Sequence, residues 1–239
     1  MFERILAPID GSPDASVALD HAIELAQEEA GTIHALFVAD SKLIEAPYRV
    51  ASMPEIMIID PRPDRTEAAL AAGRHLAEYG EATLAEAEER CDAAGVTCET
   101  EYVEGIVAVV ILNRAVDVDL VVLGRRGEGA EWAGPQLGSV LETVVRHAQA
   151  PVLTAQAEMR PIKRILVAFD GSDRAVDVLK VVAEMASLKA RSLIVLTVDD
   201  GYGDRHEAWR AGKALLAERG QKATHLYVPG HATSEILRL

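Results

Sequence analysis

The residues best suited to chemistry lie in a glycine-interrupted loop near the middle of the chain. An apolar run, residues 121–123, leads into a loop with Gly124 and Gly127, and ten residues separate Gly127 from Gly138-Ser139. Glycines let a ligand approach the main chain, and a helix beginning near Ser139 would direct N–H groups and a positive dipole end outward. An anion is favoured there. A phosphate is the expected occupant, so the loop predicts a nucleotide site.

Several of these residues also have a plainer structural interpretation. Ser139 and Glu142 form a capping-box pattern, in which the serine caps the helix and the glutamate bonds back to its amide. Arg125 and Arg126 are adjacent, and such surface arginines are commonly solvated. Asp10 lies in a turn after an earlier apolar run and can cap that turn without any ligand. Both interpretations stay open at this stage.

The composition limits the class of protein. The 239 residues suffice for one large or two modest domains, and 49% hydrophobic but only 4% aromatic residues indicate a core of aliphatic side chains and alanine. A net charge of −14 argues against a broad nucleic-acid surface and against an anionic membrane as partner. No apolar run approaches the roughly 18 residues of a membrane span.

The cysteines and the N-terminus indicate where such a protein would reside. Cys91 and Cys98 provide no disulfide framework, which favours a reducing compartment, and they lack two further ligands at zinc spacing. No signal peptide is visible at the N-terminus. The sequence therefore predicts a soluble, cytoplasmic protein.

Strand and helix patterns alternate along the first two thirds of the chain. Strands are expected at residues 4–9, 33–39, 96–103, 117–123 and 151–155, and helices at 14–30, 64–94, 106–115 and 139–148. This alternation predicts an α/β fold with a doubly wound, parallel, five-stranded sheet and right-handed crossovers. Four prolines interrupt residues 41–63, where the apolar run 56–59 is expected to pack on another surface.

The opening of the chain recurs later. Residues 4–12 align with residues 164–172, and strands and helices follow in the same order until Gly230, which matches Gly105. The second copy lacks the fourth strand, the glycine loop and the fifth strand. The sequence thus predicts domains at 1–158 and 162–239 with a truncated second copy. Its first strand would lack one neighbour, so we expect either another segment at that edge or a longer tandem protein.

These motifs, in this order, resemble the universal stress protein family. The resemblance rests on residues 9–12 (IDGS), 36–40 (LFVAD), 119–127 (DLVVLGRRG), 138–139 (GS) and 150–153 (APVL). The resemblance covers residues 1–158 fully and residues 162–239 partly, so the chain is similar to a tandem member of the family. It implies a Rossmann-like sheet of the adenine nucleotide α-hydrolase-like type.

The resemblance also implies a site for ATP and Mg²⁺ at the carboxyl ends of the strands, where Asp10 would help to hold the cation. The other implied binding residues are Pro8 in the crevice wall, Val38 at the adenine edge, Gly124 and Gly127 at the ribose and phosphates, and Gly138, Ser139 and Val140 at the phosphate tail. Apart from the resemblance, the charge of Arg125 makes it a further candidate for pairing with a phosphate. In the ATP-binding branch of the family, nine residues separate the last two glycines of this motif. In this chain ten residues, 128–137, separate Gly127 from Gly138, so the loop would have to bulge to accommodate the extra residue.

Three functions are compatible with these observations. The first is an ATP-binding, regulatory stress-response protein in which nucleotide occupancy shifts the run 56–59 or a subunit contact, within a homodimer or between the two halves. The second is a structural or interaction module of the same fold with a decayed site. The third is an adenylating enzyme, to which residues 10–16 bear only a faint resemblance. No nucleophile or general base is identifiable, although slow hydrolysis of bound ATP stays open.

Overall fold

The computed structural model describes residues 2–41, 64–127, 138–156, 158–202 and 204–239, with only the backbone described for 64–72 and 188. The chain divides into two compact units, Phe2–Met159 (the first unit) and Arg160–Leu239 (the second unit). The apolar run 56–59 and the ten-residue loop 128–137 lie outside the described residues.

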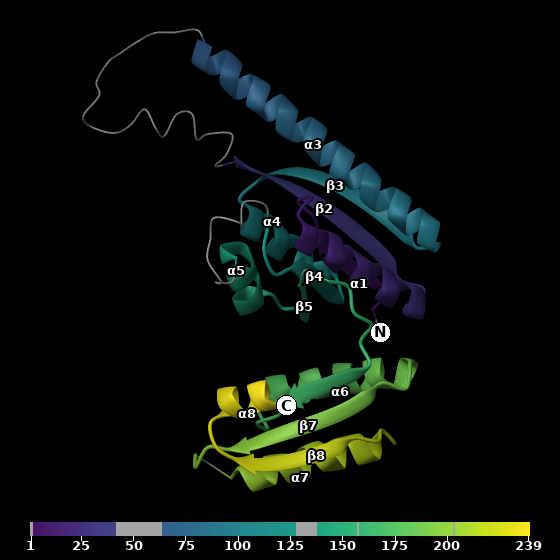
Figure 1. Ribbon diagram of the computed structural model, residues 1–239, viewed down its shortest axis with the longest axis vertical. Helices are drawn as coiled ribbons and strands as arrows, with labels where there is room; N and C mark the ends of the chain where they lie inside the picture. Colours follow the sequence, from purple (N-terminus) through teal and green to yellow (C-terminus); the bar gives the residue numbers. More distant parts are fainter. Residues whose placement is uncertain (1, 42–63, 128–137, 157, 203) are drawn as a thin grey trace, which may run out of the picture. The chain divides into compact units, whose positions relative to one another are not determined.

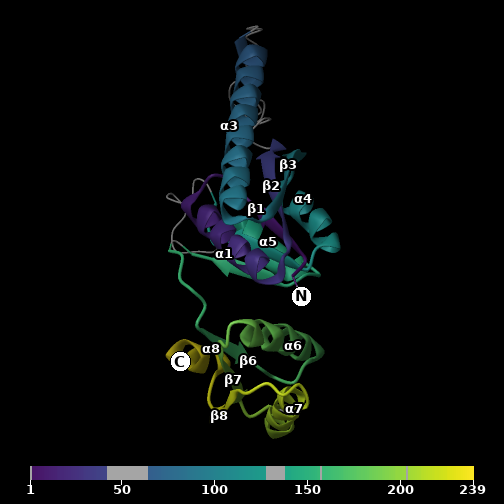
Figure 2. The same cartoon turned by 90° about the vertical axis from the view of Figure 1, so that its right-hand side faces the viewer.

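The first unit contains a five-stranded parallel sheet in the order β3-β2-β1-β4-β5, so the α/β fold predicted from the sequence is confirmed (Figure 1). Its strands are β1 (Arg4–Pro8), β2 (Thr32–Asp40), β3 (Thr97–Gly105), β4 (Leu120–Gly124) and β5 (Val152–Ala155). Its described helices are α1 (Pro13–Glu29), α3 (Asp64–Ala94), α4 (Val107–Arg114) and α5 (Ser139–His147). Helices α3 and α4 lie on opposite faces of β2 and β3 (Figure 2).

The core of this unit lies on both faces of β1 and β2. Ile5, Leu6, Ile33 and Leu36 are fully buried, as expected for strands covered on both sides by helices. Helix α1 begins at a local signal, because the Ser12 hydroxyl caps it by accepting from the Ala15 amide at 3.3 Å. These local signals keep the turn after β1 next to the end of the sheet.

Two local predictions were wrong. Gly138, not Ser139, is the N-cap of α5, and the Glu142 carboxylate pairs with Arg146 at 2.9 Å instead of forming a capping box. The fourth strand begins at Leu120, because residues Ala115–Asp117 form a 3-10 helix.

The second unit repeats the start of the first one. Its parallel sheet has the order β6-β7-β8, formed by β6 (Arg164–Ala168), β7 (Ser192–Asp199) and β8 (Thr224–Pro229), with helices α6 (Asp173–Leu188), α7 (Arg205–Glu218) and α8 (Ala232–Arg238). Ser172 caps α6 through the Ala175 amide at 3.3 Å, as Ser12 caps α1. The three strands of the second unit thus follow one another in its sheet as β1, β2 and β3 do in the first.

None of the described helices combines the length and the apolar character that crossing a membrane requires.

A charged cluster connects β2, β3 and α4 in the first unit. Glu101 accepts hydrogen bonds from Arg114 Nε at 2.9 Å and Nη2 at 2.6 Å, and its Oε2 lies 2.9 Å from His34 Nε2. The hydrogen bonds from Arg114 are the main reason that the pKa of Glu101 is lowered. A carboxyl group whose pKa is lowered by folding stabilises the fold above its unfolded pKa, and this contribution is lost as the pH falls through the folded pKa.

We therefore expect Glu101→Gln to reduce the free energy of unfolding by about 1 kcal/mol near neutral pH, since the pair is partly exposed. The deficit relative to the parent should shrink as the pH falls below the ordinary glutamate range. Urea denaturation at neutral pH and at acidic pH measures this. Glu99→Gln, at an exposed position on the same strand, is the control. A deficit that is independent of pH would contradict the assignment.

Candidate functional site

The candidate site lies at the carboxyl ends of β1 and β4. These strands are neighbours, with Ile5 opposite Leu120 and Leu6 opposite Val121, and they start the two halves of the sheet that wind in opposite directions. Open parallel sheets bind ligands at this point, because the loops after the two strands diverge and leave a crevice. β1 ends at Pro8, which is buried, and β4 ends at Gly124.

The loops after β1 and β4 are tied together by hydrogen bonds. The Ser12 hydroxyl donates to the Arg126 carbonyl at 3.3 Å, and the Arg126 amide donates to Asp14 Oδ2 at 3.1 Å. Gly124 packs directly on the first turn of α1, since a Cβ at that position would lie 2.7 Å from the Ala15 nitrogen. This contact supplies a structural reason for a glycine at position 124. A ligand role for Gly124 stays a prediction.

Asp10 has the turn-capping role that the sequence left open. Its Oδ1 accepts from the Ser12 amide at 3.0 Å, and its carbonyl accepts from the Tyr79 hydroxyl at 3.2 Å. The other carboxylate oxygen lies so close to Gly127 that a Cβ there would be 2.6 Å from it. Asp10 and Gly127, separated by more than a hundred residues, are thus brought into contact at the ends of neighbouring strands.

The remaining predicted residues lie around this pair. Arg125 Nη1 donates to the Gln156 side-chain oxygen at 3.0 Å, and the Arg125 carbonyl faces the Gly138 amide at 3.4 Å. Because that amide is engaged, Ser139 and Val140 are the residues of this segment whose amides remain candidates for a phosphate. Ser139 is exposed.

Val38 and Val140 contact a common apolar cluster. This cluster lies on the α4–α5 face of the sheet and contains Leu36, Leu123 and Leu141. The two valines, one near the end of β2 and one in the first turn of α5, are therefore placed against one core. Their predicted contacts with a nucleotide stay predictions.

Sequence reasoning missed Tyr79, Asp14 and Gln156. Tyr79 covers the turn at Gly11, whose φ of +79° and lack of a Cβ make room for the tyrosine hydroxyl. The helical pattern of residues 64–94 carries no signal for this contact. No motif predicted Asp14 or Gln156, because each contributes through a hydrogen bond to a distant loop.

The donor set suits Mg²⁺ only when it is carried by a phosphate. Mg²⁺ is commonly bound through one or two carboxylates, with substrate phosphates and water completing the shell. Asp10 supplies one carboxylate, and no group of three or more His, Cys, Asp or Glu residues that could hold a metal occurs within the described residues. The residues therefore fit a shared cation at Asp10.

The thiols are also unsuited to such a site. Cys91 and Cys98 are free, and a hydrogen bond with Cys98 together with burial raises the pKa of Cys91. The same hydrogen bond lowers the pKa of Cys98. They lie at the far ends of α3 and β3 from the carboxyl edge of the sheet.

Comparison with known proteins gives a consistent result. The model of the universal stress protein family matches residues 1–156, a range that includes every predicted site residue. The universal stress protein Slr1230 of Synechocystis is 26% identical over 99% of this chain and 85% of its own length. The universal stress protein YxiE of Bacillus subtilis is 31% identical over 64% of this chain and 98% of its own.

A crystal structure of a universal stress protein from Archaeoglobus fulgidus superimposes with a TM-score of 0.75 at 21% identity. The superposition covers 100% of this chain and 82% of the Archaeoglobus protein. At this identity the similarity concerns the fold.

Proposed function

The chain belongs to the universal stress protein family, and from this premise we propose that its first unit is a regulatory module that binds ATP together with Mg²⁺. The observation that carries the proposal is the contact between the Asp10 carboxylate and Gly127 at the point where the strand order reverses. A carboxylate opposite an open main chain suits a cation shared with a phosphate.

The residues around this contact have complementary proposed roles. Helix α5 begins at Ser139, and its N-cap Gly138 has no side chain that could accept from the first amides of the helix. The amides of Ser139 and Val140 therefore suit an anion. Mg²⁺, when bound, would neutralise phosphate charge beside Asp10. Because Ser12, Asp14 and Arg126 connect the two loops, occupancy at one loop is expected to reposition the other. This coupling would make the nucleotide a regulator.

The proposal predicts a loss of ATP binding in Gly127→Val. Any Cβ at position 127 would meet Asp10 Oδ2 at 2.6 Å, so the valine must displace the carboxylate. Calorimetric titration with ATP and MgCl₂ should detect binding to the parent and none to this variant. Gly73→Ala is the matched control, because a Cβ there has no atom within 4 Å. Equal affinities of the parent and Gly127→Val would remove the loop from the mechanism.

One observation favours an interaction module as a second candidate function. Ile106, Val109 and Val145, on or beside the packed helices α4 and α5, are each about half exposed, at 50%, 49% and 52%. Exposed aliphatic side chains suit pairing with a second copy of the chain. A protein that sediments as a dimer and whose melting temperature does not respond to ATP and Mg²⁺ would favour this candidate.

A further inference from the structure

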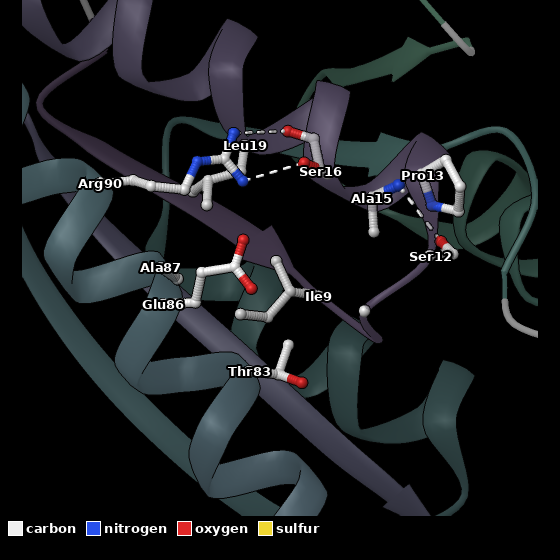
Figure 3. Close-up of a pocket in the computed structure, with 11 residues that line it drawn as sticks. Ile9, Ser12, Pro13, Ala15, Ser16, Leu19, Thr83, Glu86, Ala87 and Arg90 are labelled. Carbon is white, nitrogen blue, oxygen red and sulfur yellow. Dashed lines mark hydrogen bonds between the residues drawn. The ribbon is translucent and has the colours of Figure 1, made fainter.

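A cavity of about 160 Å³ lies between α1 and α3 of the first unit, beside the end of β1 (Figure 3). Its apolar wall is formed by Ile9, Ala15, Leu19 and Ala87, all of them buried. A water in the liquid occupies about 30 Å³, so the cavity holds on the order of five water-sized groups. None of the predicted nucleotide-binding residues lines it.

The second unit shows that the same fold can close this space. Ile9 and Phe169 occupy equivalent positions, because the Ile9 amide donates to the Leu36 carbonyl at 2.9 Å and the Phe169 amide to the Leu196 carbonyl at 2.8 Å. Phe169 is 2% exposed and belongs to the core of its unit. In the second unit, the larger side chain of Phe169 thus fills the space beside the sheet. In the first unit, Ile9 leaves the equivalent space open.

The helix opposite each of these residues differs in the complementary way. Gly11 faces Tyr79 of α3, and the equivalent Gly171 faces Ala208 of α7. One turn further on, α3 places Thr83 at the cavity, whereas α7 has Gly212. A Cβ at position 212 would lie only 3.0 Å from a carbon of the Phe169 ring, so the glycine leaves room for that ring. The second unit therefore provides a template for closing the cavity of the first.

Two charged side chains border the cavity and point in different directions (Figure 3). Arg90 reaches α1, where it donates to the Ser16 hydroxyl at 2.9 Å and to the Ser16 carbonyl at 3.1 Å and pairs with Asp20. The Glu86 carboxylate points toward Ile9, and within the described residues no hydrogen bond or ion pair engages it. An exposed, unpaired carboxylate beside the apolar wall of this cavity favours a cation with an apolar body.

We propose that this cavity binds a small organic cation, a short branched alkylammonium, with its carbon skeleton against Ile9 and Leu19 and its ammonium group on Glu86. The site is separate from the proposed nucleotide site. It shares with that site the turn at Gly11 and Ser12, which also line the cavity. Occupancy is therefore expected to shift the amide resonances of this turn.

The test uses isobutylammonium chloride, with isobutanol and isobutyrate as probes of the same shape but different charge. Titrations of the whole protein, followed by amide NMR spectra, should show saturable shifts at Ser12, Thr83 and Ala87 with the amine. The affinity for the alcohol should be lower by up to about fivefold, since a charged hydrogen bond is lost, and the affinity for the carboxylate should be lower still, since repulsion replaces it.

Two variants separate the contributions of charge and space. Glu86→Gln, at an exposed position that leaves the core intact, should weaken the amine by up to about fivefold and leave the alcohol unchanged. Ile9→Phe with Thr83→Gly copies the second unit and should abolish binding of the amine. Its circular dichroism and thermal unfolding establish that it is folded. Three results would overturn the proposal: no shifts at a large excess of amine, equal affinity for all three probes, or unchanged amine binding by Glu86→Gln.

Discussion

Asp10→Asn is expected to reduce the Mg²⁺-dependent affinity for ATP by about tenfold or more, because a carboxylate oxygen is a far better ligand for a hard cation than an amide. The asparagine oxygen can still accept from the Ser12 amide, so the turn after β1 should persist. Calorimetric titrations with ATP, with and without MgCl₂, measure the effect as the difference between the two conditions.

The second unit provides the control for this prediction. Asp170 accepts from the Ser172 amide at 2.9 Å, as Asp10 does from Ser12. It follows β6, however, and no counterpart of β4 or of Gly127 lies in the sheet of the second unit as the structure describes it. Asp170→Asn should leave ATP binding unchanged. If both variants bound Mg²⁺ and ATP like the parent, Asp10 would have only its structural role.

Gly124→Ala is expected to destabilise the first unit by about 3 kcal/mol, at the upper end of the range for overpacking. The added Cβ would lie 2.7 Å from backbone atoms of Ala15 and Asp14, and a helix backbone cannot move aside as a side-chain tip can. Displacing α1 from β4 should also break the hydrogen bond between the Arg126 amide and Asp14. Urea denaturation monitored by circular dichroism measures the loss.

Gly138→Ala is the matched substitution in the same loop region. A Cβ at position 138 would have its nearest contact at 3.5 Å, an ordinary van der Waals distance. The expected change in the free energy of unfolding is within about 1 kcal/mol, the range of exchanges at an N-cap. Similar losses for the two variants would show that glycine flexibility, and not the packing of α1 on β4, sets the cost at position 124.

Helix α3 shows how far local patterns can predict structure. The sequence predicts a helix over residues 64–94, and the structure has it at Asp64–Ala94 although it contains two glycines. The pattern does not explain Gly80. A Cβ there would lie 2.7 Å from the Phe37 ring, which stacks on Tyr102 with ring centres 5.8 Å apart. That glycine reflects packing between segments distant in sequence.

The capping-box prediction, in contrast to the prediction of α3, was wrong although its residue pattern is complete. Ser139 and Glu142 have the residue types and the spacing of a capping box, but α5 begins at Ser139 itself, one residue earlier than that pattern requires, with Gly138 as its N-cap. The Gly138 amide faces the carbonyl of Arg125, which follows β4. A hydrogen bond to a neighbouring loop thus decided where the helix starts. Such a bond leaves no periodic signal in the sequence.

The sequence by itself determined the alternation of strands and helices, the parallel sheet and the repeat, because hydrophobic period, turn residues and capping residues act over a few positions. These features also determine which loops follow the carboxyl ends of the strands. Only the tertiary structure decided that Asp10 contacts Gly127, that Gly124 supports α1, and that Ile9 leaves open the space that Phe169 fills. Each of these depends on the approach of segments far apart in the chain, and side-chain size and backbone clearance at such contacts are set by packing.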